Sequence, residues 1–551
     1  MITTRGSLFL ALAFTLSLAA CGGVSSPRQQ RELSGELVTS TNSAVVETAA
    51  GSVAGYSENN TYIYKGIPYA RAERFMPPKP IEPWSGIRSA RAYGPTCPQG
   101  NRAGWGVDEL AFVFNWDDGF ADEDCLRVNI WTPGIHKQHK RPVMVWLHGG
   151  GYATGSGQEL PSYDGTNLSR RGDVVVVTLN HRLNVLGFLD LSAFGEIYGC
   201  SGNAGLLDMV AALEWIQVNI AAFGGDPDNV TIFGQSGGGG KVSNLLATPA
   251  AKGLFHKAII QSGSVIRTME SQFSRRIGAA MLEELNLKGS QVDQLQTLPY
   301  RDLLSAGEKA IAKVRLEADK EGYAPFLVGW APTVDGDVLP VHPFSPHSPR
   351  QSKEIPLLIG STLHEMMQHR LNSSLPDLSN ETVDKELQHK YGESAVAFKK
   401  AFRKAYPDHK PADLLDVDLT YRSLSIQQAR LKVLQGGAPV YMYLFAWESP
   451  VLDGALRSSH CMELPFVFDN IDKARHMTGG GEEAALLATR MSSAWLNFAR
   501  TGDPNTEELP LWEPYTNEEG ATMIFNNHCV MKKNHDKELL DLVRLFPERG
   551  F

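Results

Sequence analysis

The stretch Val230-Thr231-Ile232-Phe233-Gly234-Gln235-Ser236-Gly237-Gly238 decides the fold. Its first four residues are β-branched or aromatic and predict a buried strand, and residues 241–247 beyond it are compatible with a helix. In such a strand-to-helix turn, glycines let the backbone pack closely and hold a strained serine with its Oγ above the sheet edge. The alternative is a glycine-rich turn with an incidental serine. The strand before the turn and the helix after it favour Ser236 as a nucleophile.

Five further apolar runs predict buried strands. They are residues 142–147 (PVMVWL), 174–179 (VVVVTL), 258–261 (AIIQ), 356–359 (PLLI) and 440–444 (VYMYL). Continuous apolar runs of this length are typical of parallel strands covered on both faces. Apolar residues recur at helical spacing over residues 206–223, and Gly224-Gly225-Asp226-Pro227 ends that helix. Strands that alternate with helices predict an α/β fold with a mostly parallel central sheet flanked by helices.

Two stretches, about 267–320 and 376–436, have a weak strand signal and many helix formers. We interpret them as helical insertions in one large domain that spans residues 45–551. A small separate domain is the alternative.

A second glycine motif follows the strand predicted at residues 142–147. His148-Gly149-Gly150-Gly151 precedes Ser236 by 85 residues, and a simple turn would rarely need three glycines. The tetrahedral intermediate of acyl transfer carries negative charge on the former carbonyl oxygen, so backbone N–H groups must point at that oxygen. We expect the N–H groups of Gly150, Gly151 and Gly237 to form this oxyanion hole, with His148 in a structural role.

With these motifs the sequence resembles the type-B carboxylesterase (cholinesterase-like) family of α/β-hydrolases. The resemblance runs from about Val46 to Phe525. The matching segments include Tyr64-Lys65-Gly66-Ile67-Pro68-Tyr69-Ala70, Glu123-Asp124-Cys125-Leu126, Asn129-Ile130-Trp131-Thr132-Pro133, Gly202-Asn203-Ala204-Gly205-Leu206-Leu207-Asp208 and Phe223-Gly224-Gly225-Asp226-Pro227. The resemblance implies an α/β-hydrolase fold with helical insertions and the hydrolysis of carboxylic esters, without a cofactor.

The resemblance also implies an acid and a base for Ser236. The family's acid is a Glu in a G-x-x-x-x-E stretch after a late strand, which fits Glu365 in Gly360-Ser361-Thr362-Leu363-His364-Glu365. Its His lies a few residues before an E-L-P-F-V-F-like segment, which fits His460. The chain order Ser236, Glu365, His460 is that of α/β-hydrolases.

In this reading His460 is the general base and then the general acid, and Glu365 orients the imidazole and stabilises its cation. Four other residues are candidates for these roles but are expected to be structural or supporting: His364, His181, Glu463 and Asp335.

The nucleophile turn departs from the family's common G-E-S-A-G. Gln235 removes a carboxylate beside the nucleophile, and a side chain there is not required for the triad. Gly237 in place of Ala frees the donor peptide, which we expect to loosen the oxyanion hole.

Five cysteines lie beyond residue 21, so an odd thiol is expected to stay free unless it pairs between chains. The resemblance pairs Cys97 with Cys125 as the family's N-terminal disulfide, while a Cys200–Cys461 bridge is conceivable. Arg74 and Glu123 match a buried family ion pair. The cysteines and histidines lack zinc-like spacing, so we expect no metal site.

The N-terminal residues are typical of a targeting signal. Arg5 is the only charge before residue 28, and the apolar run 6–20 is too short to span a membrane but fits a secretory signal. Leu18-Ala19-Ala20-Cys21 resembles a bacterial lipobox, in which the cysteine is lipidated; an ordinary signal peptide is the alternative. We therefore expect a signal over residues 1–20, a lipid on Cys21, a polar tether over residues 21–44, and export to the bacterial cell envelope with membrane contact through the lipid alone.

Composition excludes other classes. Hydrophobic residues make up 42% and charged residues 21%, which is globular, and no block of like charge accompanies the net charge of −9, so no nucleic-acid partner is expected. The sequence thus predicts a serine hydrolase that cleaves small-molecule carboxylic esters through an acyl-enzyme. Its alternatives are the same triad on an amide, carbamate or lactone, and a non-catalytic binding protein, although such proteins usually lose a triad member.

Overall fold

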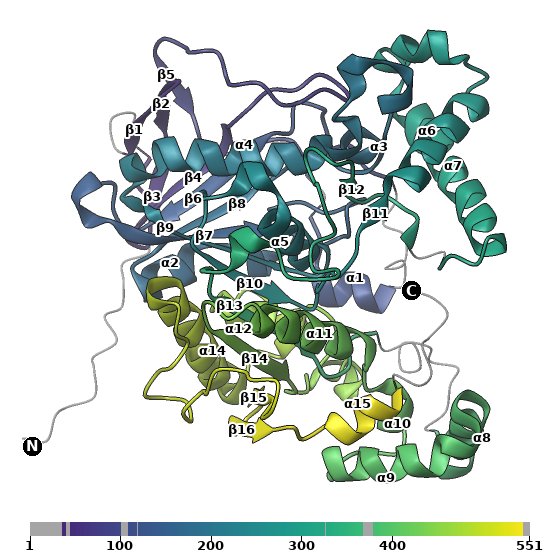
Figure 1. Ribbon diagram of the computed structural model, residues 1–551. Helices are drawn as coiled ribbons and strands as arrows, with labels where there is room; N and C mark the ends of the chain where they lie inside the picture. The colour runs from purple at the N-terminus through teal and green to yellow at the C-terminus, as the bar shows by residue number, and fades with distance from the viewer. Residues whose placement is uncertain are drawn as a thin grey trace, which may run out of the picture.

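The computed structural model describes residues 36–39, 44–100, 108–117, 119–324, 327–366 and 378–543. One large sheet organises these residues (Figure 1). In spatial order its strands are β16 (Val530–Lys533), β15 (Ala521–Phe525), β14 (Val440–Phe445), β13 (Leu357–Thr362), β10 (Lys257–Gln261), β9 (Gly225–Gln235), β7 (Arg141–Leu147), β8 (Val175–Leu179), β6 (Arg127–Thr132), β4 (Thr61–Pro68) and β3 (Tyr56–Glu58). The strands from β15 to β8 run parallel, and the strands at both edges pair antiparallel.

All six apolar runs predicted as strands form strands of this sheet. Every residue of β8, β10, β13 and β14 is buried, as expected of parallel strands covered on both faces. β9 is longer than predicted, because it begins at Gly225 in the segment expected to end the preceding helix.

β7 shows how the two faces of the sheet are filled. Val143, Val145 and Leu147 lie in one core while Met144 and Trp146 lie in another, because successive strand side chains point to opposite faces. The helices α4 (Ala204–Asn219), α5 (Gly237–Ala247) and α11 (Thr420–Leu434) contribute to the first core, and α12 (Leu464–Val467) and α14 (Glu482–Thr501) contribute to the second. The mostly parallel sheet with flanking helices is the predicted α/β-hydrolase arrangement.

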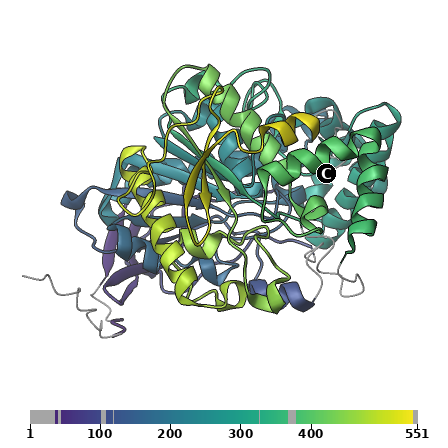
Figure 2. The same ribbon diagram turned by 90° about the horizontal axis from the view of Figure 1, so that it is seen from below.

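Both predicted insertions are helical. The first holds α6 (Ser271–Glu284) and α7 (Tyr300–Lys320); the second holds α8 (Asn380–Tyr391), α9 (Ala395–Ala405) and α10 (Asp413–Asp416) before α11. α8 and α9 share a small core of their own with α15 (Lys537–Val543). The insertions lie on the same side of the molecule in Figures 1 and 2, opposite the N-terminal strands β1 (Val45–Thr48) and β2 (Gly51–Ala54).

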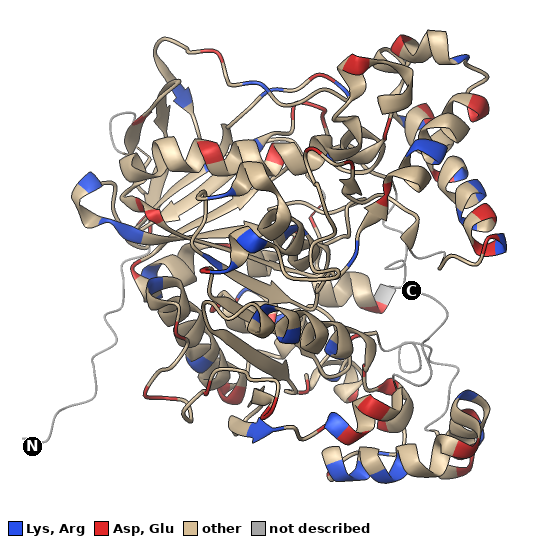
Figure 3. Cartoon of the chain, viewed as in Figure 1, with Lys and Arg blue, Asp and Glu red and all other residues tan. Residues whose placement is uncertain are grey.

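Charged side chains are spread over the outer helices and loops, and the central strands carry few of them (Figure 3). One helical run, Glu196–Phe223, is long and apolar enough to cross a membrane, but 56% of its apolar window is buried in the protein, which is typical of a core helix. The predicted signal over residues 1–20 and the predicted lipid site Cys21 lie outside the described residues. Of the predicted tether, residues 36–39 and 44 are described, and Val38 pairs with Ser57 through backbone hydrogen bonds.

Candidate active site

Ser236 occupies the turn between β9 and α5 with φ 58° and ψ −127°, a conformation that non-glycine residues rarely adopt. Two hydrogen bonds hold it there: its N–H donates to Gln261 O (2.8 Å), and its carbonyl accepts from Gly240 N (3.1 Å). Close packing adds to them, because a Cβ on Gly263 would lie only 2.0 Å from Ser236 O. Ser236 itself remains partly exposed, while Gln235 before it is fully buried. Hydrogen bonds and close packing therefore fix the backbone of this turn, while the serine stays partly exposed.

The side chains of His460 and Glu365 contact each other. Glu365 follows β13, His460 precedes α12, and His460 Nδ1 is hydrogen-bonded to Glu365 Oε2. The backbone N–H of His460 donates to Glu365 O (2.9 Å), and Thr362 N–H donates to the other carboxylate oxygen (2.9 Å). Only 3% of His460 and 2% of Glu365 is exposed, so the pair is fixed in a low-dielectric environment. The contact expected between these two side chains is present.

Gln235 lies on the other side of the imidazole. Its amide nitrogen is 3.1 Å from His460 Nε2 and 3.3 Å from Nδ1, and Cys461 Sγ donates to its amide oxygen (3.2 Å). Within the described part of the chain, no hydrogen bond joins Ser236 to His460. A nucleophile–base bond is often long without substrate, and in this turn it is Gln235, the residue before Ser236, that contacts His460.

Three carboxylates lie around His460, and two of them, Glu365 and Glu463, are buried. Burial alone would lower the pKa of His460, but Glu365, with Glu463 and Asp418 beyond it, raises that pKa above its ordinary value. Burial and the Glu365 charge raise the pKa of Glu463 to about 7 and that of Asp418 to about 8. The site therefore favours a protonated imidazole more than water does.

The other acid candidates are bonded elsewhere. Glu463 Oε1 accepts a hydrogen bond from Gln261 Nε2 (3.3 Å), and the Asp335 carboxylate accepts one from Asn203 Nδ2 (2.7 Å). Of the carboxylates weighed from the sequence, Glu365 is the one in hydrogen-bond contact with His460.

The two competing histidines are also engaged elsewhere. His364 Nε2 lies 3.6 Å from Asp413, and His181 Nδ1 lies 2.8 Å from Arg182 O. Both side chains are buried in these contacts. Neither forms a hydrogen bond with Ser236 in the part of the chain that the structure describes.

The expected oxyanion donors gather beside the serine. Gly150 and Gly151 adopt φ 78° and 63° and are exposed, and a Cβ on Gly149 would lie 3.5 Å from Ser236 Cβ. A Cβ on Gly237 would lie 2.3–2.4 Å from the backbone of Gly151, closer than any side chain can come. Because Gly237 has no Cβ, the backbone of Gly151 packs directly against it and fills the space that an alanine side chain would take. This close packing differs from the looser oxyanion hole expected from the sequence.

The cysteines are thiols in this structure. Cys97 and Cys125 are buried, and Cys200 and Cys461 are partly buried. Cys97 and Cys125 are nevertheless neighbours, since a hydrogen bond between them, together with burial, raises the pKa of Cys125. The pair has the proximity that a disulfide needs without the covalent bond.

The Arg74–Glu123 ion pair is also present. Arg74 Nε donates to Glu123 Oε2 (2.6 Å), but 38% of the Glu123 side chain is exposed, so the pair is not buried as expected.

Among the described residues, no group of three or more His, Cys, Asp or Glu side chains is placed to hold a metal ion.

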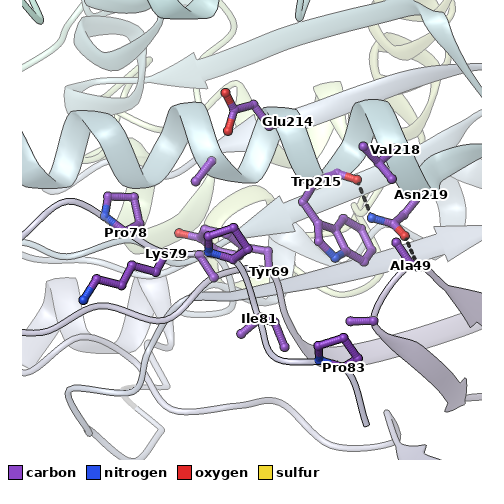
Figure 4. A pocket seen from close by; sticks show the side chains of 14 residues that line it. Ala49, Tyr69, Pro78, Lys79, Ile81, Pro83, Glu214, Trp215, Val218 and Asn219 are labelled. Atoms are coloured by element: carbon purple, nitrogen blue, oxygen red, sulfur yellow. Dashed lines mark hydrogen bonds between the residues drawn. The ribbon is translucent and has the colours of Figure 1, made fainter.

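A cavity of about 280 Å³ lies on the outer side of α4 (Figure 4). Tyr69, Trp215 and Asn219 line it, and Asn219 bridges Ala49 N–H and Trp215 O with hydrogen bonds of 2.8 Å each. None of the residues expected in catalysis lines this cavity.

Comparisons with known proteins identify the family of the chain. Residues 42–543 match the model of the carboxylesterase family. The chain is 39% identical over 514 residues to the para-nitrobenzyl esterase of Bacillus subtilis (strain 168), which covers 92% of this chain and 99% of that protein. It is 32% identical over 501 residues to the phenmedipham hydrolase of Pseudarthrobacter oxydans, which covers 87% and 94%.

Comparison with solved structures shows that the similarity extends to the fold. An esterase from anaerobic Clostridium hathewayi, described as able to hydrolyse aliphatic aromatic polyesters, matches with a TM-score of 0.83 at 40% identity and covers 93% of this chain and 99% of that chain. A thermophilic para-nitrobenzyl esterase matches with a TM-score of 0.74 at 36% identity, covering 91% and 99%. The chain therefore belongs to the carboxylesterase family and is a carboxylic-ester hydrolase with the α/β-hydrolase fold.

Proposed function

We propose that the protein hydrolyses small-molecule carboxylic esters through an acyl-enzyme on Ser236, with His460 as base and Glu365 as acid. The observation that carries the proposal is the buried Glu365–His460 hydrogen bond behind a strained, partly exposed serine. A hydroxyl is a poor nucleophile until a base takes its proton, and a carboxylate on Nδ1 holds the imidazole in the tautomer whose Nε2 can do so.

The reaction begins when His460 Nε2 accepts a hydrogen bond from the Ser236 hydroxyl. Ser236 Oγ attacks the ester carbonyl as its proton passes to Nε2, and the developing oxyanion accepts hydrogen bonds from the N–H groups of the oxyanion glycines, Gly150, Gly151 and Gly237. His460 then protonates the departing alcohol, and the acyl group stays on Ser236. Water, deprotonated by His460, releases the acid by the reverse steps.

The same triad can act on amides, carbamates or lactones, since the binding pocket and the leaving group decide between them. The name of one relative, para-nitrobenzyl esterase, and the description of the polyester-cleaving structure favour esters with aromatic parts. We therefore propose small esters with an aromatic acyl or alcohol group as the first substrates to test.

A panel of chromogenic esters of varied acyl length, together with amides of the same acyl groups, tests the proposal. Hydrolysis of the esters, a burst of alcohol equal to the enzyme concentration, and its disappearance in Ser236→Ala are expected. Near-normal turnover by folded Ser236→Ala would rule out the acyl-enzyme on this residue. Faster cleavage of the amides than of the matched esters would favour the alternative substrates.

We also propose that the protein is exported and anchored to the bacterial cell envelope by a lipid on Cys21. The support is the uncharged apolar run 6–20 that ends in Leu18-Ala19-Ala20-Cys21. In an oxidising compartment the neighbouring thiols of Cys97 and Cys125 would form the disulfide that the family resemblance implies.

A further inference from the structure

Lys241 is a buried cation that the ester-hydrolysis mechanism leaves unexplained. It is the one basic residue of α5, it stands five positions after Ser236, and its side chain has no exposed surface (0%). Fully buried lysines are rare because desolvating an ammonium group is costly. No carboxylate in the described part of the chain forms an ion pair with it. The buried Lys241 ammonium therefore needs a role other than an ion pair.

The Lys241 ammonium instead donates to the backbone of the oxyanion loop, residues 148–151. Its Nζ lies 2.8 Å from His148 O and 3.4 Å from Gly149 O. His148 Nδ1 also lies 2.9 Å from Gly149 O, so two side chains hold the same carbonyl. The ring of Tyr152 closes the site, with its centroid 6.0 Å from Nζ.

Peptide geometry connects these carbonyls with the oxyanion hole. In a trans peptide the C=O of one residue and the N–H of the next point in opposite directions. A Gly149 carbonyl that faces Lys241 under the loop therefore turns the Gly150 N–H to the opposite side of the loop. On the mechanism proposed above, that side is where the oxyanion forms.

We propose that Lys241 is a positioning residue that fixes the oxyanion loop from beneath, so that the Gly150 N–H is aimed at the developing oxyanion. The proposal rests on the acyl-enzyme at Ser236. The ammonium also polarises the peptide between Gly149 and Gly150, which makes its N–H a stronger donor when negative charge develops.

The charged groups that face Lys241 support this assignment. Burial, together with the charge of Lys241, lowers the pKa of both His148 and His181, whose rings stack 5.1 Å apart, so these histidines are neutral. Burial lowers the pKa of Lys241 to about 7, and the Glu159 carboxylate opposes that shift. Lys241 is thus the group of this cluster that carries positive charge below about pH 7, and it loses that charge within the pH range where activity can be measured.

Lys241→Met tests the proposal, with Lys432→Met as the matched control. Lys432 is also fully buried and donates to a backbone carbonyl, Lys353 O (2.8 Å), but lies on α11 away from the oxyanion loop. Removing a whole oxyanion donor costs about 10²–10³ in kcat, so misaiming one donor should lower kcat about 10- to 100-fold. KM should change less than about threefold, because the ground-state carbonyl makes weaker use of the hole.

A trifluoromethyl ketone that forms a tetrahedral adduct with the serine provides the second readout. Its affinity should fall in Lys241→Met by the same factor as kcat, and should be unchanged in Lys432→Met. Lys241→Met that folds and matches the wild type in both kcat and ketone affinity overturns the proposal. Inactive Ser236→Ala alongside a normal Lys241→Met would overturn this inference alone, whereas active Ser236→Ala would overturn the proposed function.

Two further measurements apply if Lys241→Met does not fold. Lys241→Gln keeps a donor without the charge and should show a smaller loss of kcat than expected for Met. The kcat of the wild type, followed to about pH 10, should fall on the alkaline side as Lys241 loses its proton. A kcat that stays level across that range would overturn the role of the charge.

Discussion

The amide nitrogen of Gln235 lies 3.1 Å from His460 Nε2, the imidazole nitrogen that the Glu365 carboxylate leaves free. Because Nδ1 donates to Glu365 in the neutral imidazole, Nε2 is an acceptor there, and an amide N–H₂ is its matching donor. The residue before the nucleophile thus contacts the base directly, and the same amide nitrogen lies 3.3 Å from Nδ1. A carboxylate in the same place would instead attract the imidazolium.

Gln235→Glu should therefore move the pH dependence of activity. A carboxylate within hydrogen-bond distance stabilises the protonated imidazole and raises the pKa of His460 further, by about one unit or more. The base is then neutral only at higher pH, so the acidic limb of kcat/KM should shift upward and activity below it should fall. A limb that stays in place would show that Gln235 does not sense the charge of His460.

Glu365→Gln should fold and lose most of its activity. The amide cannot stabilise the imidazolium and favours the wrong tautomer, which costs about 10⁴ in kcat for an equivalent change in a serine protease. The pKa of His460, which Glu365 raises, should fall, so the residual activity should persist to lower pH.

Glu463→Gln is the matched control for Glu365→Gln, because Glu463 is buried near His460 but bonded to Gln261. It should reduce kcat far less than Glu365→Gln. Equal losses in the two variants would show that the cluster acts by its summed charge and that Glu365 has no special place.

The strands and Ser236 were predictable because local signals define them. Continuous apolar runs identify β7, β8, β9 and β10, and the glycines around Ser236 mark the turn. Glu365 could be assigned only through the family resemblance, since nothing in its own segment distinguishes it from Glu463.

The contact of Gln235 with His460 and the burial of Lys241 could not be predicted, for physical reasons. Gln235 meets His460, 225 residues away, and no local pattern encodes such a contact. A lysine in a helix is normally solvated, so the burial of Lys241 becomes visible only when the loop at His148 is folded over α5. The one signal was the unusual G-Q-S-G-G-G-G-K sequence itself.

The Cys97–Cys125 disulfide remains a prediction for protein exported to an oxidising compartment. Closing this 28-residue separation should raise the free energy of unfolding by about 3–4 kcal/mol by the loop-entropy argument. Thiol titration in denaturant should find two fewer thiols than in protein treated with a reductant, and the reductant should lower Tm. Equal thiol counts would leave the pair as the two thiols of the structure.

Lipidation of Cys21 gives a prediction that is independent of the site. Expressed with its own signal in a bacterial host, the protein should partition with membranes and carry the mass of acyl chains, and Cys21→Ala should lose both properties. Cys200→Ala, which leaves the lipobox intact, is the control. A soluble, unmodified wild type would favour the ordinary signal peptide.

The strained turn at Ser236 predicts that replacing the serine by glycine stabilises the fold. Ser236 holds φ 58° and ψ −127°, which costs about 1–3 kcal/mol for a residue with a Cβ and little for glycine. Ser236→Gly should therefore raise the free energy of unfolding by about 0.5–2 kcal/mol, after the greater entropy of glycine in the unfolded chain is subtracted. Ser236→Ala keeps the Cβ, so its stability should stay close to that of the wild type, while both variants should lose several orders of magnitude in kcat. Urea unfolding of the three proteins measures the difference. Equal stability of Ser236→Gly and Ser236→Ala would mean that the surrounding glycines and the Gln261 hydrogen bond hold the turn without strain at Ser236 itself.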